Sequence, residues 1–216
     1  MKTNQLFIKA LAFSVLGSVF MSCQKDEAAP VVTIKAETVK DLAADPGVIS
    51  GTAQPVLTGK YTFFSFQNGI LASSDSATTK WDLAFRGTII LTNGGTSGPG
   101  MGGAIVRDAL FTDIKEAPTT GFVQDSKTSF AITASSGKGW YNYNGATNII
   151  SPIAGKVIIV KTADGKYAKM EILSYYKGAP ATPDANSVGR YYTFRFVYQG
   201  NGMTKFEESL IKLNKS

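Results

Sequence analysis

The chain has 216 residues, of which 44% are hydrophobic and 18% charged, so it can bury a substantial core, and its length favours one domain. Its net charge is +6, but the lysines and arginines are scattered rather than gathered in a basic stripe, which argues against nucleic-acid binding. The sequence contains no histidine, which excludes histidine-based catalysis and histidine metal ligation.

The N-terminus has the pattern of an export signal. Lys2 supplies positive charge, and residues 10–21 (ALAFSVLGSVFM) form an uncharged apolar run that is too short for a permanent membrane span. The small Ser22 precedes Cys23, the one cysteine in the chain. This arrangement resembles a bacterial lipobox, so we predict that residues 1–22 are a lipoprotein signal peptide and that Cys23 carries the lipid.

Residues 23–30 are predicted to be a lipid-anchored tether, and residues 31–216 a single domain. The tag Lys25-Asp26-Glu27 looks like the signal that sends some lipoproteins of Gram-negative bacteria to the outer face of the outer membrane. Alternatively, these residues are only a solvated linker, or the protein faces the periplasm instead of the cell surface. With Cys23 acylated, no thiol remains for a disulfide, so the domain must be stabilised by its core.

The first half of the domain is predicted to begin with a short helix around residues 37–44, ended by Asp45-Pro46, and to continue as strands. Residues 60–66 (KYTFFSF) are aromatic and β-branched. Residues 80–86 (KWDLAFR) alternate, which predicts Trp81, Leu83 and Phe85 on one face and Asp82 toward solvent. Residues 88–92 form a further β-prone run.

The C-terminal half contains a hairpin signal. Residues 156–162 and 166–176 are joined by Ala163-Asp164-Gly165, in which glycine can take the left-handed position. Residues 190–199 can pair back, with alternate aromatic residues on one face: Tyr192, Phe194, Phe196 and Tyr198. We therefore predict an all-β fold, a predominantly antiparallel β-sandwich or partly closed barrel.

A glycine-rich segment, residues 93–103 (NGGTSGPGMGG), lacks the lysine and following helix of a phosphate-binding loop. One interpretation is a mobile loop between strands. Met101 favours another, because a thioether in a glycine loop has no evident packing reason and can ligate haem iron. Met203 follows a turn and is a second candidate, whereas Met170 shares a strand face with apolar residues and is expected in the core.

Aromatic residues also gather at residues 139–144 (GWYNYN). Trp140, Tyr141 and Tyr143 could be ordinary sheet packing, or they could stack on a flat ligand such as a porphyrin or a sugar ring. The carboxylates give no sign of an acid/base pair, and no nucleophile stands beside an activating base. We therefore expect that the protein is not an enzyme.

Several of these segments together resemble the HmuY-like haem-binding lipoproteins. The similar segments are residues 80–86 followed by 92–97, residues 139–143 leading to Pro152, and residues 155–157 and 161–172. The resemblance covers roughly residues 60–198.

The resemblance implies an all-β domain outside the cell that captures haem and passes it to a TonB-dependent outer-membrane receptor. Some members of that family hold haem iron between two histidines, and this chain contains no histidine. Asn148 lies in the segment where the resemblance would place one of those histidine ligands. The resemblance also implies methionine ligation in other members, which keeps Met101 and Met203 as candidates. The alternative function is an adhesion or glycan-binding module that uses Trp140 and the tyrosines.

Overall fold

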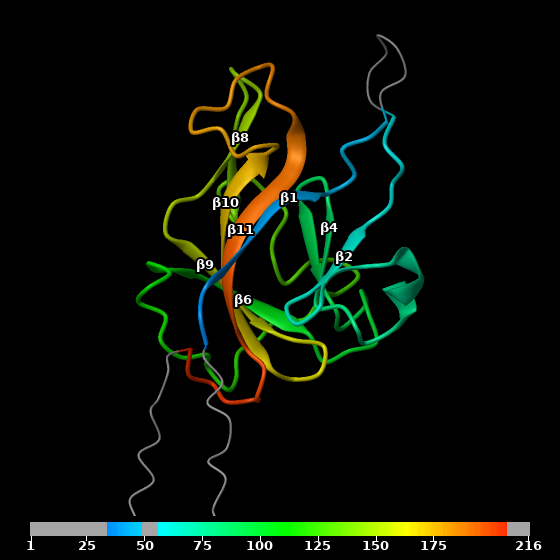
Figure 1. Cartoon of the computed structure of the whole chain (residues 1–216), viewed down its shortest axis with the longest axis vertical. Helices are drawn as coiled ribbons and strands as arrows, with labels where there is room; N and C mark the ends of the chain where they lie inside the picture. The colour runs from blue at the N-terminus through cyan, green and yellow to red at the C-terminus, as the bar shows by residue number, and fades with distance from the viewer. Residues whose placement is uncertain (1–33, 49–55, 207–216) are drawn as a thin grey trace, which may run out of the picture. The chain divides into compact units, whose positions relative to one another are not determined.

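The computed structural model describes residues 34–48 and 56–206, and this part of the chain is built from β-strands (Figure 1). Its one helical element is a 3-10 helix, η1, at Ser73–Ala77. No helix among the described residues is long and apolar enough to cross a membrane. The predicted signal peptide, Cys23 and the predicted tether lie outside the described residues.

The strands form three antiparallel sheets. The five-stranded sheet has the order β1-β11-β10-β9-β6, and the four-stranded sheet has the order β3-β2-β4-β5. In chain order the strands of these two sheets are β1 (Glu37–Ala43), β2 (Thr62–Ser65), β3 (Gly69–Leu71), β4 (Leu83–Arg86), β5 (Ile89–Thr92), β6 (Gly103–Asp108), β9 (Lys156–Lys161), β10 (Tyr167–Tyr176) and β11 (Gly189–Gln199). β7 (Tyr141–Asn144) and β8 (Ile149–Pro152) form a separate hairpin. The predicted all-β antiparallel fold is confirmed, as open sheets rather than a closed barrel.

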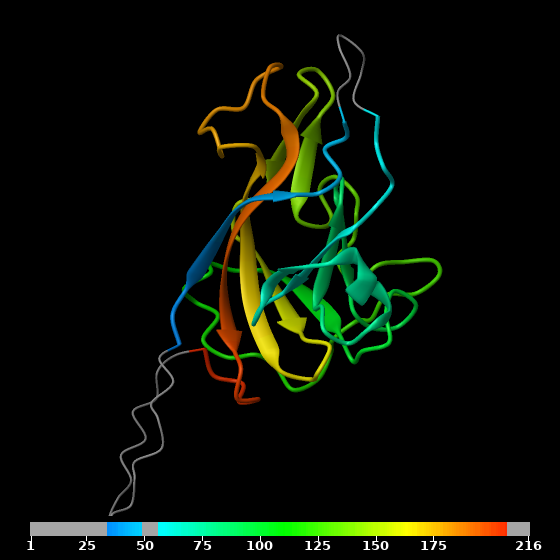
Figure 2. The ribbon, with the colours of Figure 1, turned by 45° about the vertical axis from the view of Figure 1, so that its right-hand side comes forward.

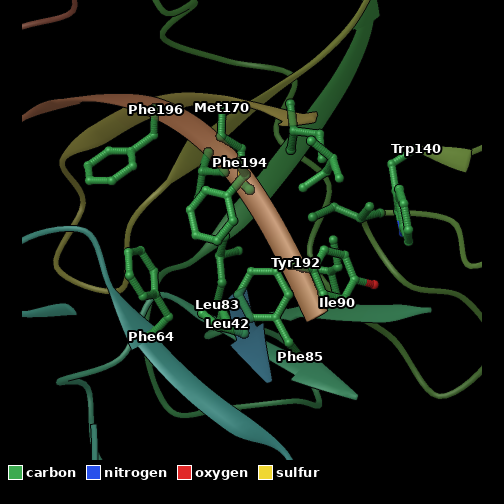
Figure 3. Close-up of a cluster of buried hydrophobic side chains, with 14 of the residues drawn as sticks. Leu42, Phe64, Leu83, Phe85, Ile90, Trp140, Met170, Tyr192, Phe194 and Phe196 are labelled. Atoms are coloured by element: carbon green, nitrogen blue, oxygen red, sulfur yellow. The ribbon is translucent and has the colours of Figure 1, made fainter. Parts of the chain in front are cut away.

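The main core lies between the two larger sheets (Figure 3). Phe194 of β11 meets Phe64 of β2 edge-on at 5.3 Å between ring centroids and stacks on Phe85 of β4 at 5.7 Å. The predicted aromatic face of β11 is confirmed, because Tyr192, Phe194 and Phe196 are buried in this cluster and Tyr198 packs against it. Met170 is also in the core, as predicted.

The predicted helix over residues 37–44 is wrong, because this segment is strand β1 at the edge of the five-stranded sheet. Its register against β11 shifts between Val39 and Leu42, and Asp41 has a φ of 54°. Such a bulge lets two residues three positions apart face the same side. Val39 and Leu42 both contact the core, so the bulge reproduces an apolar spacing that is typical of a helix.

The predicted solvent-facing position of Asp82 is also wrong. Strand β4 begins only at Leu83, so alternation does not extend back to residues 80–82. Asp82 is buried, and its carboxylate accepts hydrogen bonds from the backbone N–H of Phe66 at 2.9 Å and of Ala163 at 3.1 Å. Phe66 directly follows β2, and Ala163 lies in the β9–β10 turn, so one carboxylate joins the two sheets. Trp81 packs against Phe63 instead of joining the main core.

A second set of polar contacts joins the sheets at the other end of β11. The N–H of Gly87 donates to the carbonyl of Ala44 at 2.8 Å, and the Tyr192 hydroxyl donates to the carbonyl of Gly87 at 2.8 Å. Nearby, the Asp45 carboxylate accepts bonds from the N–H and hydroxyl of Thr58, both at 2.9 Å, and from the N–H of Gly59 at 2.8 Å. These bonds close the base of the excursion between β1 and β2.

The two carboxylates should have opposite effects on pH-dependent stability. Burial raises the pKa of Asp82, against the hydrogen bonds from Phe66 and Ala163. Burial also opposes ionisation of Asp45, but the bonds from Thr58 and Gly59 and the charge of Arg190 lower its pKa below the ordinary value. A raised pKa means that the folded state binds more protons than the unfolded state, so stability falls as pH rises through it; a lowered pKa has the reverse effect.

The free energy of unfolding of the parent should exceed that of Asp82→Asn by an amount that grows as pH falls from about 7 to about 4. The difference between the parent and Asp45→Asn should stay the same between about pH 7 and about pH 4, and it should shrink below about pH 4. Urea unfolding at a series of pH values measures both differences. Parallel pH trends for the two variants would contradict the assignment.

Candidate functional site

The predicted site residues lie at two opposite ends of the five-stranded sheet. We call the first the turn end; it comprises the glycine loop (residues 93–103), the β9–β10 turn (162–166) and residues 200–206. We call the second the hairpin end; it comprises the β7–β8 hairpin and the β10–β11 loop (177–188). β10 runs between them, and its ten residues span about 34 Å. In both ribbon views the two ends are well separated (Figure 2).

The glycine loop is organised by Asn93, whose side chain is fully buried. Its Nδ2 donates to the carbonyls of Thr78 at 2.9 Å and Trp81 at 2.8 Å, and its Oδ1 accepts from the N–H of Gly100 at 3.0 Å. The N–H of Gly102 donates to the Asn93 carbonyl at 2.8 Å. One side chain therefore fixes both the start and the far side of the loop.

The glycines are required because backbone segments approach one another closely inside the loop. A Cβ on Gly94 would collide with the carbonyl oxygen of Gly102, and one on Gly98 would collide with the Asn93 side chain. Gly95, which has a φ of 62°, lies against the carbonyl of Asp125. The loop is thus packed backbone to backbone, and its composition has a structural reason.

Met101 stands at the surface of this packed loop, with 54% of its area exposed. Its N–H donates to the carbonyl of Ala163 at 2.9 Å, and its methyl carbon lies over Gly165 in the β9–β10 turn. The structure thus gives Met101 a packing partner that the sequence did not reveal, while leaving most of the thioether accessible. Met203 lies at the same end and is 44% exposed.

The three aromatic residues of the segment 139–144 lie at the hairpin end, and they differ in how deeply they are buried. Trp140 is 1% exposed, donates from Nε1 to the carbonyl of Thr88 at 3.0 Å, and lies 5.0 Å from the ring of Tyr192 (Figure 3). Tyr141 is buried beside it, with ring centroids 4.9 Å apart. Both rings are explained by core packing. Tyr143 is 47% exposed.

Tyr143 has the geometry of a side chain that could bind a ligand. It alternates with Tyr141 and pairs with Ile150, so it lies on the face of the hairpin that continues the core. Its hydroxyl donates to Oδ1 of Asn148 at 2.6 Å, and Asn148 has a φ of 57° in the hairpin turn. Ile150 is joined to β10 because its N–H donates to the Tyr176 hydroxyl at 2.9 Å. The phenol is therefore accessible and its orientation is fixed.

Two other phenols at this end, those of Tyr175 and Tyr192, are buried in the core and are not accessible to a ligand. Burial raises the pKa of Tyr175 to about 12 and raises that of Tyr192 far above its usual range. Both hydroxyls stay protonated in the core. Tyr143 is thus the accessible tyrosine of the aromatic set that the sequence singled out.

Sequence reasoning missed the residues that position the loops, Asp82 and Asn93. The Asn-Gly pair at residues 93–94 indicated only a turn, and no local pattern signals that an asparagine is buried. Among the described residues, no group of three or more carboxylates or cysteines could hold a metal ion.

The chain was compared with known protein families and solved structures. A family model described as HmuY protein matches residues 58–198. Similar solved structures include a protein from Bacteroides fragilis described as a lipoprotein (18% identity, 76% of this chain and 90% of that chain, TM-score 0.46). A protein from Bacteroides vulgatus described as HmuY-like and haem-binding is 19% identical, with 76% of this chain and 91% of that chain covered and a TM-score of 0.44. An apo HmuY analogue from Tannerella forsythia is 16% identical, with 77% of this chain and 95% of that chain covered and a TM-score of 0.42. No curated protein matches the chain.

The packing of the glycine loop predicts different costs for two glycine-to-alanine changes. Gly94→Ala should lower the free energy of unfolding by about 1–3 kcal/mol, because the added methyl group meets a backbone carbonyl that cannot move freely. Gly145→Ala is the control, since its Cβ would have only an ordinary 3.9 Å contact with Tyr143. Chemical denaturation measures both, and equal stability of the two variants would show that the loop is loosely packed.

Proposed function

The chain belongs to the HmuY family, and we propose that it is a lipid-anchored protein of the outer membrane that captures haem at the cell surface and passes it to a TonB-dependent receptor. The observation that carries the proposal is the family match over residues 58–198, which includes every strand of the core from β2 to β11. The protein acts as a carrier and does not alter the haem chemically.

The anchor in this proposal is Cys23, with residues 1–22 removed as the signal peptide and residues 23–30 as the tether to a single domain. Support comes from the sequence, in which an apolar run and Ser22 precede the cysteine. Acyl chains attached at one residue hold a protein on a membrane firmly only when there is more than one of them.

The chain has no histidine, so the axial ligands considered for haem iron are a phenol and a thioether; the alternative is an aromatic clamp that does not ligate the iron. We propose Tyr143 as the ligand, because it is exposed and lies on the face that continues the core; the bond from its hydroxyl to Asn148 belongs to the neutral phenol and is given up when the phenolate binds iron. A phenolate is a known haem ligand and, as a hard oxygen donor, suits ferric iron. Apolar surface for the porphyrin would come from the same face, including Ile150.

Met101 is the alternative ligand, and Met203 lies on another segment of the same turn end. Its thioether is accessible on a packed loop, and a thioether is a soft ligand that favours ferrous iron. Met101 and Tyr143 are separated by the length of β10, so they cannot ligate the same haem. The two assignments therefore predict opposite redox preferences.

We expect haemin titration of the parent protein to give a shifted Soret band, with tighter binding in air than after dithionite reduction. Tyr143→Phe should weaken the ferric complex at least about tenfold, which is about 1.4 kcal/mol. The ferrous complex should change little. Tyr167→Phe, at the other end of β10, is the matched control.

The same titrations test the alternatives. If Met101→Ala weakens the ferrous complex and Tyr143→Phe has no effect, the site is at the turn end. If the parent shows no Soret change in either redox state, haem capture is wrong and the glycan-binding function gains support. That function would depend on Tyr143 alone among the three aromatic candidates, because Trp140 and Tyr141 are buried.

Cys23→Ala should move the protein from the membrane fraction to the soluble fraction, because the substitution removes the one thiol that can be acylated. Detergent-free fractionation of cells measures the change. Lys25→Ala, which keeps the thiol, should remain membrane-bound. An unchanged distribution of Cys23→Ala would place the anchor elsewhere in the chain.

A further inference from the structure

The described domain begins at the turn end. Ile34, the first described residue, packs against a small cluster on the outer face of the five-stranded sheet that includes Phe206, the last described residue. The C-terminal segment is fixed there, since the N–H of Phe206 donates to the carbonyl of Lys115 at 2.8 Å and the Thr204 carbonyl accepts from Ala117 at 2.9 Å. From Ile34 the chain runs along β1 toward the hairpin end.

This position limits how far the turn end can be from the lipid. Ten residues lie between Cys23 and Ile34, and the eleven residue-to-residue steps of a fully extended chain reach at most about 40 Å. The hairpin end lies the length of β10 further along the domain. The chain therefore enters the domain at the turn end, and the length of chain between Cys23 and Ile34 limits how far that end can lie from the proposed anchor.

The turn end exposes three large apolar side chains on different segments. Met101 covers Gly165 in the β9–β10 turn, and Val123 forms a bridge with Ala104 at the start of β6. The ring of Phe122 lies 5.8 Å from that of Tyr167, which pairs with Gln199 just before the Met203 turn. Met101, Val123 and Met203 are 54%, 53% and 44% exposed. These three residues are the apolar tips of the turn end.

Lysines surround these tips. Lys161 and Lys166 flank the β9–β10 turn, and Lys35 and Lys205 lie at the two ends of the described chain. Lys166 pairs with Asp164 at 2.9 Å. Among the described residues, carboxylates near this end include Glu37 and Asp113, which are exposed, Glu116, which accepts a bond from the Thr204 hydroxyl, and Asp125, which is buried beside the glycine loop. The cations can approach lipid phosphates while the apolar tips meet the boundary between headgroups and acyl chains.

We propose that the turn end is a lipid-facing surface, on which Met101, Val123 and Met203 insert shallowly into the membrane and the surrounding lysines contact anionic phosphates. The inference rests on the proposed anchor at Cys23. It assigns the exposed thioethers to the membrane and leaves the hairpin end, with Tyr143, directed away from the lipid, where haem and a partner protein can approach.

The test uses the full lipidated chain, in which Cys23 is acylated and an added cysteine is the one reactive thiol. Met101→Cys, Val123→Cys and, as the control at the hairpin end, Val188→Cys are each labelled with an environment-sensitive fluorophore. The proteins are reconstituted into phosphatidylethanolamine–phosphatidylglycerol vesicles with or without a nitroxide-labelled lipid. We expect the nitroxide to quench the probes at 101 and 123 and to leave the probe at 188 unchanged. Lys166→Gln with Lys205→Gln should reduce the quenching.

Vesicle flotation separates the two ways in which the experiment can fail. If the labelled chain does not float with vesicles, the anchor proposal fails. If it floats but all three probes are quenched equally, or only the probe at 188 is quenched, the lipid-facing assignment of the turn end is overturned while the anchor stands.

Discussion

The carboxylate of Asp82 is the constraint on which the turn end depends. It is buried, and it accepts one hydrogen bond from the chain leaving β2 and another from the β9–β10 turn, so it joins the two sheets of the sandwich. The same turn receives the N–H of Met101 at the Ala163 carbonyl. Burial raises the pKa of Asp82, whereas the two hydrogen bonds that make the connection favour the ionised carboxylate. The aromatic core packs between the sheets, and the carboxylate adds a polar contact between them at this end.

The alternation of apolar and polar residues predicts the strands that have one face buried in the core. Met170 in β10 and Phe194 in β11 follow strict alternation, and both are buried as predicted. β1 could not be predicted in this way, because its bulge gives Val39 and Leu42 the spacing of a helix. Asp82 was misplaced for a related reason: alternation applies only within a strand, and nothing local in the sequence marks where β4 begins.

The candidate site shows a different limit of sequence reasoning. Residue chemistry selected Met101, Met203, Trp140, Tyr141 and Tyr143, but chemistry does not reveal which of them are accessible or share a surface. The structure buries Trp140 and Tyr141 and places the methionines about the length of β10 from Tyr143. That separation arises from contacts between segments far apart in the chain, such as Ile150 with Tyr176 and Met101 with Ala163. Local patterns carry no information about such contacts.

The proposed anchor at Cys23 and the proposed haem ligand Tyr143 are compatible because the turn end and the hairpin end lie at opposite ends of the five-stranded sheet. A hard phenolate ligand suits the ferric iron of haem in oxidising surroundings outside the cell, whereas a thioether would favour the reduced form. A thioether that faces lipid does not compete for the haem, so the methionines of the turn end need no role in ligation. β10 and β11 are paired over most of their length, so the sheet keeps the turn end and the hairpin end apart, which the proposed separation of anchor and ligand site requires.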